Sequence, residues 1–174
     1  MKLVYRDENI VSEAEALSKE LGFELERRET LDELVQSFKV ANRGKAVGAP
    51  IPEAFVDLGK YLAVFFVEIV VGGIAWDFLK PRIVRFISNV RGKTRDTYKS
   101  FALSDGGDPN QFESNIYFFI PVDLSEDELA TALDKAHRII GLISKLREES
   151  KIAGSLRFSY SGGGFTLRQL AISS

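Results

Sequence analysis

The chain has 174 residues, 45% of them hydrophobic and 28% charged, a composition typical of one globular domain. Its 23 Lys and Arg residues against 25 Asp and Glu residues give a net charge of −2, which disfavours a nucleic-acid binder. The absence of cysteine excludes disulfides, thiolate metal sites and cysteine nucleophiles. We therefore expect a single domain over residues 1–174.

The first part of the chain, residues 1–44, is expected to contain short helices and edge strands. It begins with MKLVYRDENI, which lacks the apolar region of a signal peptide and turns acidic within ten residues. This start favours a cytoplasmic location. Residues 2–5 are predicted to form a short strand.

Two capping boxes indicate two short helices in this N-terminal segment. Ser12 to Glu15 offers a serine hydroxyl and a glutamate that can each satisfy a free backbone N–H at a helix start. Gly22 is predicted to end the first helix in the left-handed conformation. Residues 23–29 alternate weakly, as an edge strand does, and Thr30 to Glu33 repeats the capping box.

The middle of the chain is predicted to be a linker followed by a long helix. Glycines and prolines gather over residues 45–51, which we assign as the linker. Residues 52–91 are expected to form an apolar central helix that begins at Pro52. Pro81 removes a hydrogen bond from this helix and clashes with the preceding turn, so a kink is expected near it.

The apolar tract Tyr61 to Trp76 raises the alternative of membrane contact. The tract is 16 residues long and carries one charge, Glu68, whereas a spanning helix needs about 20 apolar residues. A carboxylate in the bilayer centre is costly, and further charges align with Glu68 along one face of the predicted helix. A buried helix is therefore favoured, and a lipid-contacting helix remains the alternative.

The last part of the chain, residues 94–172, is predicted to form a sheet with the element order ββαββ. A third capping box, Ser125 to Glu128, opens an amphipathic helix between the two pairs of strands. The expected strands are residues 95–104, 112–122, 155–160 and 165–172. The predicted fold is accordingly α+β, with a four-stranded, mainly antiparallel sheet preceded by two short helices and the long central helix.

The sequence supports no catalytic, cofactor-binding or metal-binding residue, and no cofactor is expected. Gly92 to Thr94 resembles the end of a phosphate loop, but a helix precedes it and the required earlier glycine is absent. The acidic turn after Asp105 lacks the ligand spacing of a calcium loop. His137 is the only histidine and has no cysteine to share a metal with.

Two arginines are the candidate binding residues. A hairpin that turns at residues 161–164 places Tyr160 opposite Phe165 and Phe158 opposite Leu167, which would set Arg157 opposite Arg168. Like charges that face each other destabilise a strand pair unless something offsets them. A nearby Glu or Asp in the fold, or long side chains that extend into water, would offset the charges in the ordinary way. The alternative is that Arg157 and Arg168 form a binding site for an anionic partner, and the acidic overall charge favours a protein carboxylate over a phosphate or RNA.

These observations favour a non-catalytic protein-interaction module that binds and regulates or neutralises another protein. A membrane-associated protein that uses residues 61–76 is the alternative, and a small carboxylate-based enzyme is a second one. The partner's identity is open, a homo-oligomer is also open, and nucleic acid is disfavoured as a partner.

Overall fold

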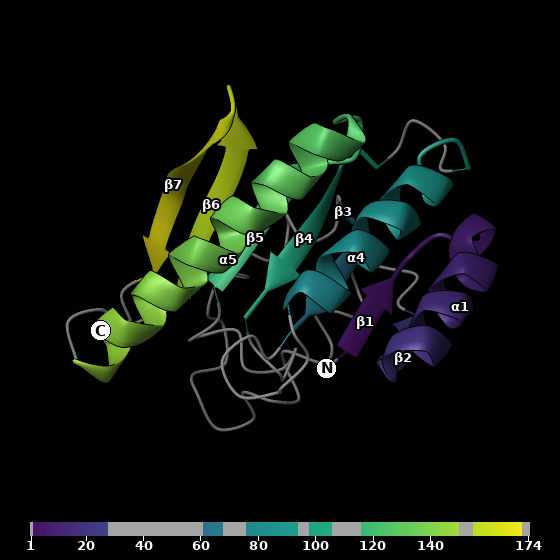
Figure 1. The fold of residues 1–174 in the computed structure, drawn as a ribbon, viewed down its shortest axis with the longest axis horizontal. Helices are drawn as coiled ribbons and strands as arrows, with labels where there is room; N and C mark the ends of the chain where they lie inside the picture. The colour runs from purple at the N-terminus through teal and green to yellow at the C-terminus, as the bar shows by residue number, and fades with distance from the viewer. Residues whose placement is uncertain are drawn as a thin grey trace, which may run out of the picture.

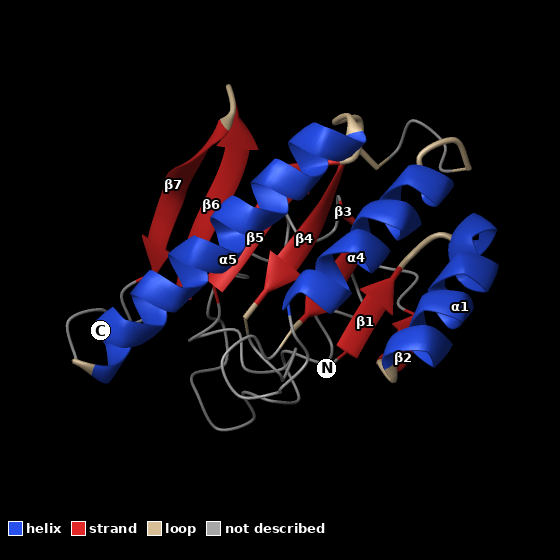
Figure 2. Ribbon diagram, viewed as in Figure 1, coloured by secondary structure: helices blue, strands red, loops and turns tan. Residues whose placement is uncertain are grey.

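A computed structural model describes residues 2–27, 61–67, 76–93, 98–105, 116–149 and 155–171. They form a seven-stranded mixed sheet with α-helices on one of its faces (Figures 1 and 2). The strands are β1 Lys2–Tyr5, β2 Glu24–Arg27, β3 Tyr61–Phe66, β4 Ser100–Ser104, β5 Ile116–Pro121, β6 Ser155–Ser161 and β7 Gly164–Ala171. The helices are η1 Glu8–Ile10, α1 Val11–Leu21, α4 Trp76–Val90 and α5 Glu126–Glu148.

The sheet is built from three successive βαβ units. Its strand order is β2-β1-β3-β4-β5-β6-β7, and the pairs β1–β2, β3–β4 and β5–β6 are parallel. A parallel pair needs a crossover connection, and α1, α4 and α5 each lie between the two strands of one such pair in the chain. The units meet through the antiparallel pairs β1–β3 and β4–β5, and β7 adds antiparallel to β6.

The main core fills the space between the sheet and the three α-helices. Phe65 of β3 is fully buried, and its ring meets those of Phe86 and Phe101 edge to face at centroid distances of 5.7 and 5.8 Å. Such edge-to-face pairs add stabilisation beyond the burial of apolar area. On β5, alternate residues point to opposite faces, yet both Phe118 and Tyr117 are buried.

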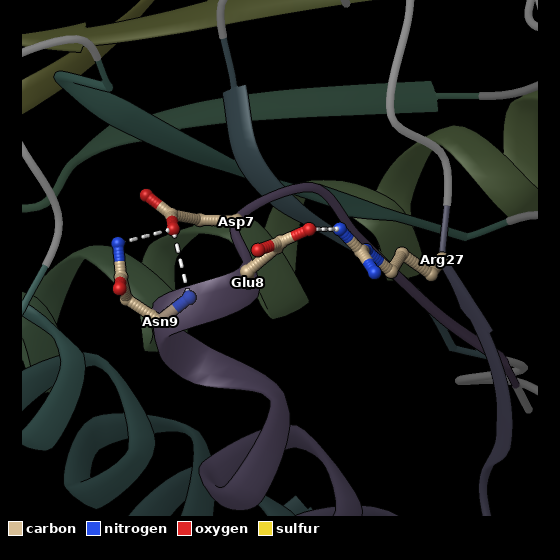
Figure 3. A network of polar contacts seen from close by, with 4 residues as sticks. All are labelled: Asp7, Glu8, Asn9 and Arg27. Carbon is tan, nitrogen blue, oxygen red and sulfur yellow. Dashed lines mark hydrogen bonds and ion pairs between the residues drawn. The ribbon is translucent and has the colours of Figure 1, made fainter.

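Helix ends follow local sequence signals in two of the three predicted places. Gly22 ends α1 with φ 67°, and Ser125 and Glu128 form a complete capping box at the start of α5, as predicted. The capping box predicted at Ser12 is wrong, because α1 begins two residues earlier and Ile10 is its N-cap. Asp7 instead caps the short helix η1, accepting a hydrogen bond from the backbone of Asn9 (Figure 3).

The predicted long central helix over residues 52–91 is wrong. Residues 61–66 form strand β3 between β1 and β4, and helix α4 starts only at Trp76 and continues through Pro81. A continuous apolar run suits a strand buried on both faces as well as it suits a buried helix, and the sequence YLAVFF is rich in strand-forming residues. No helix within the described ranges is both long enough and apolar enough to cross a bilayer.

The predicted four-stranded, mainly antiparallel sheet is also wrong. The elements β4, β5, α5, β6 and β7 do follow the order ββαββ, but they belong to the larger mixed sheet, in which β5 and β6 are parallel. Helix α5 needs to return across the sheet, and this return places β6 beside β5 in the same direction. The linker 45–51, the second short helix, Glu68 and the turn 106–115 lie outside the described residues.

Phe65→Ala tests the assignment of β3 to the core. The substitution removes a fully buried ring and should lower the free energy of unfolding by about 3–5 kcal/mol. Phe78→Ala is the matched control, because Phe78 is 44% exposed and its ring mainly supports the Arg82 guanidinium 3.4 Å above it. That control should cost about 1 kcal/mol or less in denaturant melts. Equal losses for the two variants would contradict the assignment.

Candidate functional site

One edge of the sheet, strand β2, is protected because it is short and charged. Strand β2 has four residues, ELER, three of them charged. Lys2 on β1 forms ion pairs with both Glu24 and Glu26. Arg27 donates to the Glu8 carboxylate at 2.5 Å (Figure 3). Short, charged edge strands discourage pairing with another chain.

The opposite edge, β7, lacks most of these protections. Its eight residues, GFTLRQLA, include one charged residue, Arg168, and no proline. Within the described ranges β7 pairs with β6 alone, so its outer row of backbone groups faces away from the sheet. One protective feature, a β-bulge, is present. The register shifts because Phe158 pairs with Leu167 whereas Arg157 pairs with Gln169, which leaves Arg168 as a bulge.

Exposed leucines lie next to this open edge. Leu142 is 63% exposed, Leu146 36% and Leu167 45%. The two α5 leucines are one turn apart, so they share a face of the helix. Leu167 points to the helix side of the sheet, because its partner Phe158 stacks on the core ring of Phe118 at 5.0 Å. We call these three leucines and the outer edge of β7 the α5/β7 surface.

Helix α5 is tied to the hairpin at one point. The Lys135 ammonium donates a hydrogen bond to the Gly163 carbonyl in the turn between β6 and β7. From this point α5 and β7 run in the same general direction beside each other (Figure 1). The α5/β7 surface is therefore continuous from the helix to the strand.

A polar cluster fixes α5 against α4. The Trp76 ring stacks on the His137 ring at 4.5 Å with the planes 5° apart. The Asp134 carboxylate accepts from the Trp76 indole at 2.9 Å and from the Lys80 ammonium at 2.9 and 3.0 Å. Burial alone would raise the pKa of Asp134, but these two donors together lower it. The cluster holds the outer surface of α5 in place.

His137 contributes its ring to this packing. Partial burial lowers its pKa, although the nearby carboxylates of Asp134 and Asp77 act in the opposite direction. A neutral imidazole stacked on an indole packs as an aromatic ring. Over the described ranges, no group of three or more histidines and carboxylates is arranged to hold a metal ion.

The two arginines predicted to bind an anion are not paired across the hairpin. Arg157 is 7% exposed, makes contacts inside the protein and lies opposite Gln169. Arg168 is exposed at the bulge of the edge strand. The extra residue at the bulge removes the like-charge pair that motivated the prediction. Arg168 alone lies beside the α5/β7 surface.

A shallow groove of about 410 Å³ separates α4 from the first turns of α5. Lys80 and Arg85 line one side, and Glu126 and Asp127 line the other. Ser88 also belongs to the lining, but its hydroxyl oxygen is buried and has no hydrogen-bond partner. The two cations and two carboxylates offset one another, so the groove favours neither an anion nor a cation.

Asp105, from the turn tested as a calcium loop, has a structural role in the described part of the chain. It follows β4 and accepts a hydrogen bond from the backbone of Ile116 at 2.7 Å, while Arg147 of α5 approaches its carboxylate at 3.8 Å. Burial raises the pKa of Asp105, and both partners oppose this effect. The residue joins β4 to β5 and to the end of α5.

The segment that resembled a phosphate loop follows the end of α4. The Lys93 backbone donates to the Val90 carbonyl, which closes the turn after the helix, and the Lys93 ammonium pairs with Glu13 of α1. Thr94 lies outside the described residues.

Comparisons with known proteins add no relative to this picture. No family model, no curated protein and no solved structure matches the chain. The function of the chain is therefore inferred from the α5/β7 surface.

Sequence reasoning did not identify the α5/β7 surface, although part of its signal is in the sequence. Leu142 and Leu146 lie outside the apolar stripe of the Ser125 helix, which runs through Leu133, Ile140 and Ile143. Leucines outside the buried stripe of an amphipathic helix are candidates for a contact surface. That β7 forms an edge could be learned only from the structure.

The His137 packing predicts a dependence of stability on pH. The folded state lowers the pKa of His137, so on acidification the unfolded chain takes up its proton first and stability falls. Between about pH 7.5 and 5.5, the melting temperature of the wild type should fall more than that of His137→Phe, which keeps a ring on Trp76. Parallel pH profiles for the two proteins would contradict this account.

Proposed function

We propose that the protein is a non-catalytic protein-binding module that uses the α5/β7 surface to contact its partner. The observation that carries the proposal is the difference between the two sheet edges. β2 is short, charged and held by ion pairs, whereas β7 is long, nearly uncharged and flanked by exposed leucines. Exposed apolar side chains gathered beside an open strand are typical of a protein-interaction surface.

The energetics of the surface support this role. Complete burial of a leucine side chain contributes about 1.5–3 kcal/mol relative to full exposure. For Leu142 and Leu167 much of this stabilisation is still to be gained on binding, because 63% and 45% of their surfaces are exposed to water in the free protein. The cluster around Asp134 and His137 fixes α5 in advance, so binding would require little ordering of the helix.

Arg168 supplies a charge at the border of the apolar surface. A cation at the rim of an interface steers an acidic partner and sets orientation more than it adds affinity. This role keeps the expected preference for a protein carboxylate, now for Arg168 without Arg157, which is buried.

Site-specific photo-crosslinking tests the proposed surface. A photo-reactive amino acid at Leu142 should form an adduct of higher mass with a protein chain in cells, and Leu146→Glu should weaken that adduct because it places a charge in the apolar contact. Glu24, exposed on the protected edge, is the control position and should give little adduct. Equal yields at the two positions, or no effect of Leu146→Glu, would contradict the proposal.

The proposal includes the cytoplasmic location expected from the sequence. Residues 61–66, the first part of the tract 61–76 considered for membrane contact, form a strand within the sheet, whereas residues 68–75 lie outside the described ranges. On fractionation of expressing cells, the protein should be recovered without detergent, because Leu62, Ala63 and Phe65 of β3 are buried in the core. Quantitative recovery in the carbonate-resistant membrane pellet would contradict this expectation.

A further inference from the structure

We propose that the partner at the α5/β7 surface is a second copy of this chain, related to the first by a two-fold axis. This inference rests on the proposed function and names the occupant of the same surface. In the pair, the two α5 helices cross antiparallel and the two β7 edges face each other. The residues of the surface are arranged in a self-complementary way, as a two-fold interface requires.

The exposed leucines of α5 and β7 lie at similar levels along the helix and the strand. Lys135 contacts Gly163, so these two residues mark a common starting point on the helix and the strand. Leu142 lies seven residues further along α5, about 10 Å at 1.5 Å per residue. Leu167 lies four residues beyond Gly163, about 13 Å at the rise of a strand, so the two leucines differ in level by only about 3 Å. One axis can therefore pass close to both leucines.

The order of side chains along the outer face of α5 also suits a two-fold contact. Lys135, Leu142 and Glu149, the C-cap of α5, are spaced seven residues apart, so they follow one stripe of the helix to its end, with Ile139 and Leu146 beside it. When this stripe is crossed antiparallel with its own copy near Leu142, Ile139 meets Leu146 and Lys135 meets Glu149. Apolar side chains meet at the centre, and opposite charges meet at both ends.

Strand β7 lies beneath the helices in the proposed pair. Leu167 points to the helix side, so the two copies of Leu167 would fill the space under the crossing helices. The bulge at Arg168 interrupts the outer ladder of β7, which limits any direct strand pairing between copies. The apolar contact therefore provides the main stabilisation of the pair, and the exposed Arg168 at the bulge lies at the border of this contact.

A second copy fits these features better than an unrelated partner. An apolar centre with a cation at one end and an anion at the other requires of its partner the same pattern in reverse order. A two-fold copy provides that pattern without any further residue. The protected edge β2 remains outside the contact, so the pair is closed and does not extend into a filament.

Sedimentation velocity of the full chain over a range of concentrations tests the inference. The wild type should sediment as a dimer, and Leu142→Glu should be monomeric because it buries a carboxylate at the axis. Glu149→Lys should weaken dimerisation about tenfold, since it creates two like-charge contacts with Lys135. A cation is favourable at a helix C-terminus, so the variant should fold, which circular dichroism checks.

The charge swap supplies the decisive comparison. Adding Lys135→Glu to Glu149→Lys should restore dimerisation, because the two opposite pairs are formed again in reverse. A monomeric wild type at every concentration, or a double variant no better than Glu149→Lys, would overturn the inference. If the wild type is monomeric while the crosslink at Leu142 captures a different protein and Leu146→Glu abolishes it, the inference fails and the proposed function stands. If no crosslink forms, both fail.

Discussion

The fold depends on the placement of β3 at the junction of the sheet. β3 pairs antiparallel with β1 on one side and parallel with β4 on the other, so it joins the first βαβ unit to the rest of the molecule. Phe65 extends from it into the layer between sheet and helices, where it touches rings from both α4 and β4. Without β3, the pair β1–β2 would have no other neighbour in the sheet.

Local signals in the sequence predict the elements whose ends are determined by their own residues. Gly22 ends α1 because it adopts φ 67°, and Ser125 with Glu128 starts α5 because both partners of the capping box are present. The pairing of Tyr160 with Phe165, and of Phe158 with Leu167, follows from the glycine-rich turn. These features need no knowledge of the remaining fold.

The rest of the fold depends on contacts between distant residues, which no local pattern specifies. The run YLAVFF has no periodicity to distinguish strand from helix, because β3 is flanked by two strands and the demand for apolar residues is nearly continuous. No local sequence signal indicates the bulge at Arg168 either. This shift of one residue nevertheless changes every later pair in the hairpin. For the candidate surface, Leu142 was within reach of sequence reasoning, but the open edge beside it was not.

The sheet order has a consequence for how the chain acquires its fold during synthesis. Apart from the exchange of β1 and β2, the spatial order of the strands is the order in which they are made. Each new βαβ unit can therefore dock on an edge that already exists, without opening a finished pair. Until β7 is added, β6 is the edge of the growing sheet, and Leu156 and Phe158 lack their cross-strand partners Leu170 and Leu167. Addition of β7 therefore makes β7 the exposed edge of the sheet, and this edge lies at the surface where a second finished chain can cover it.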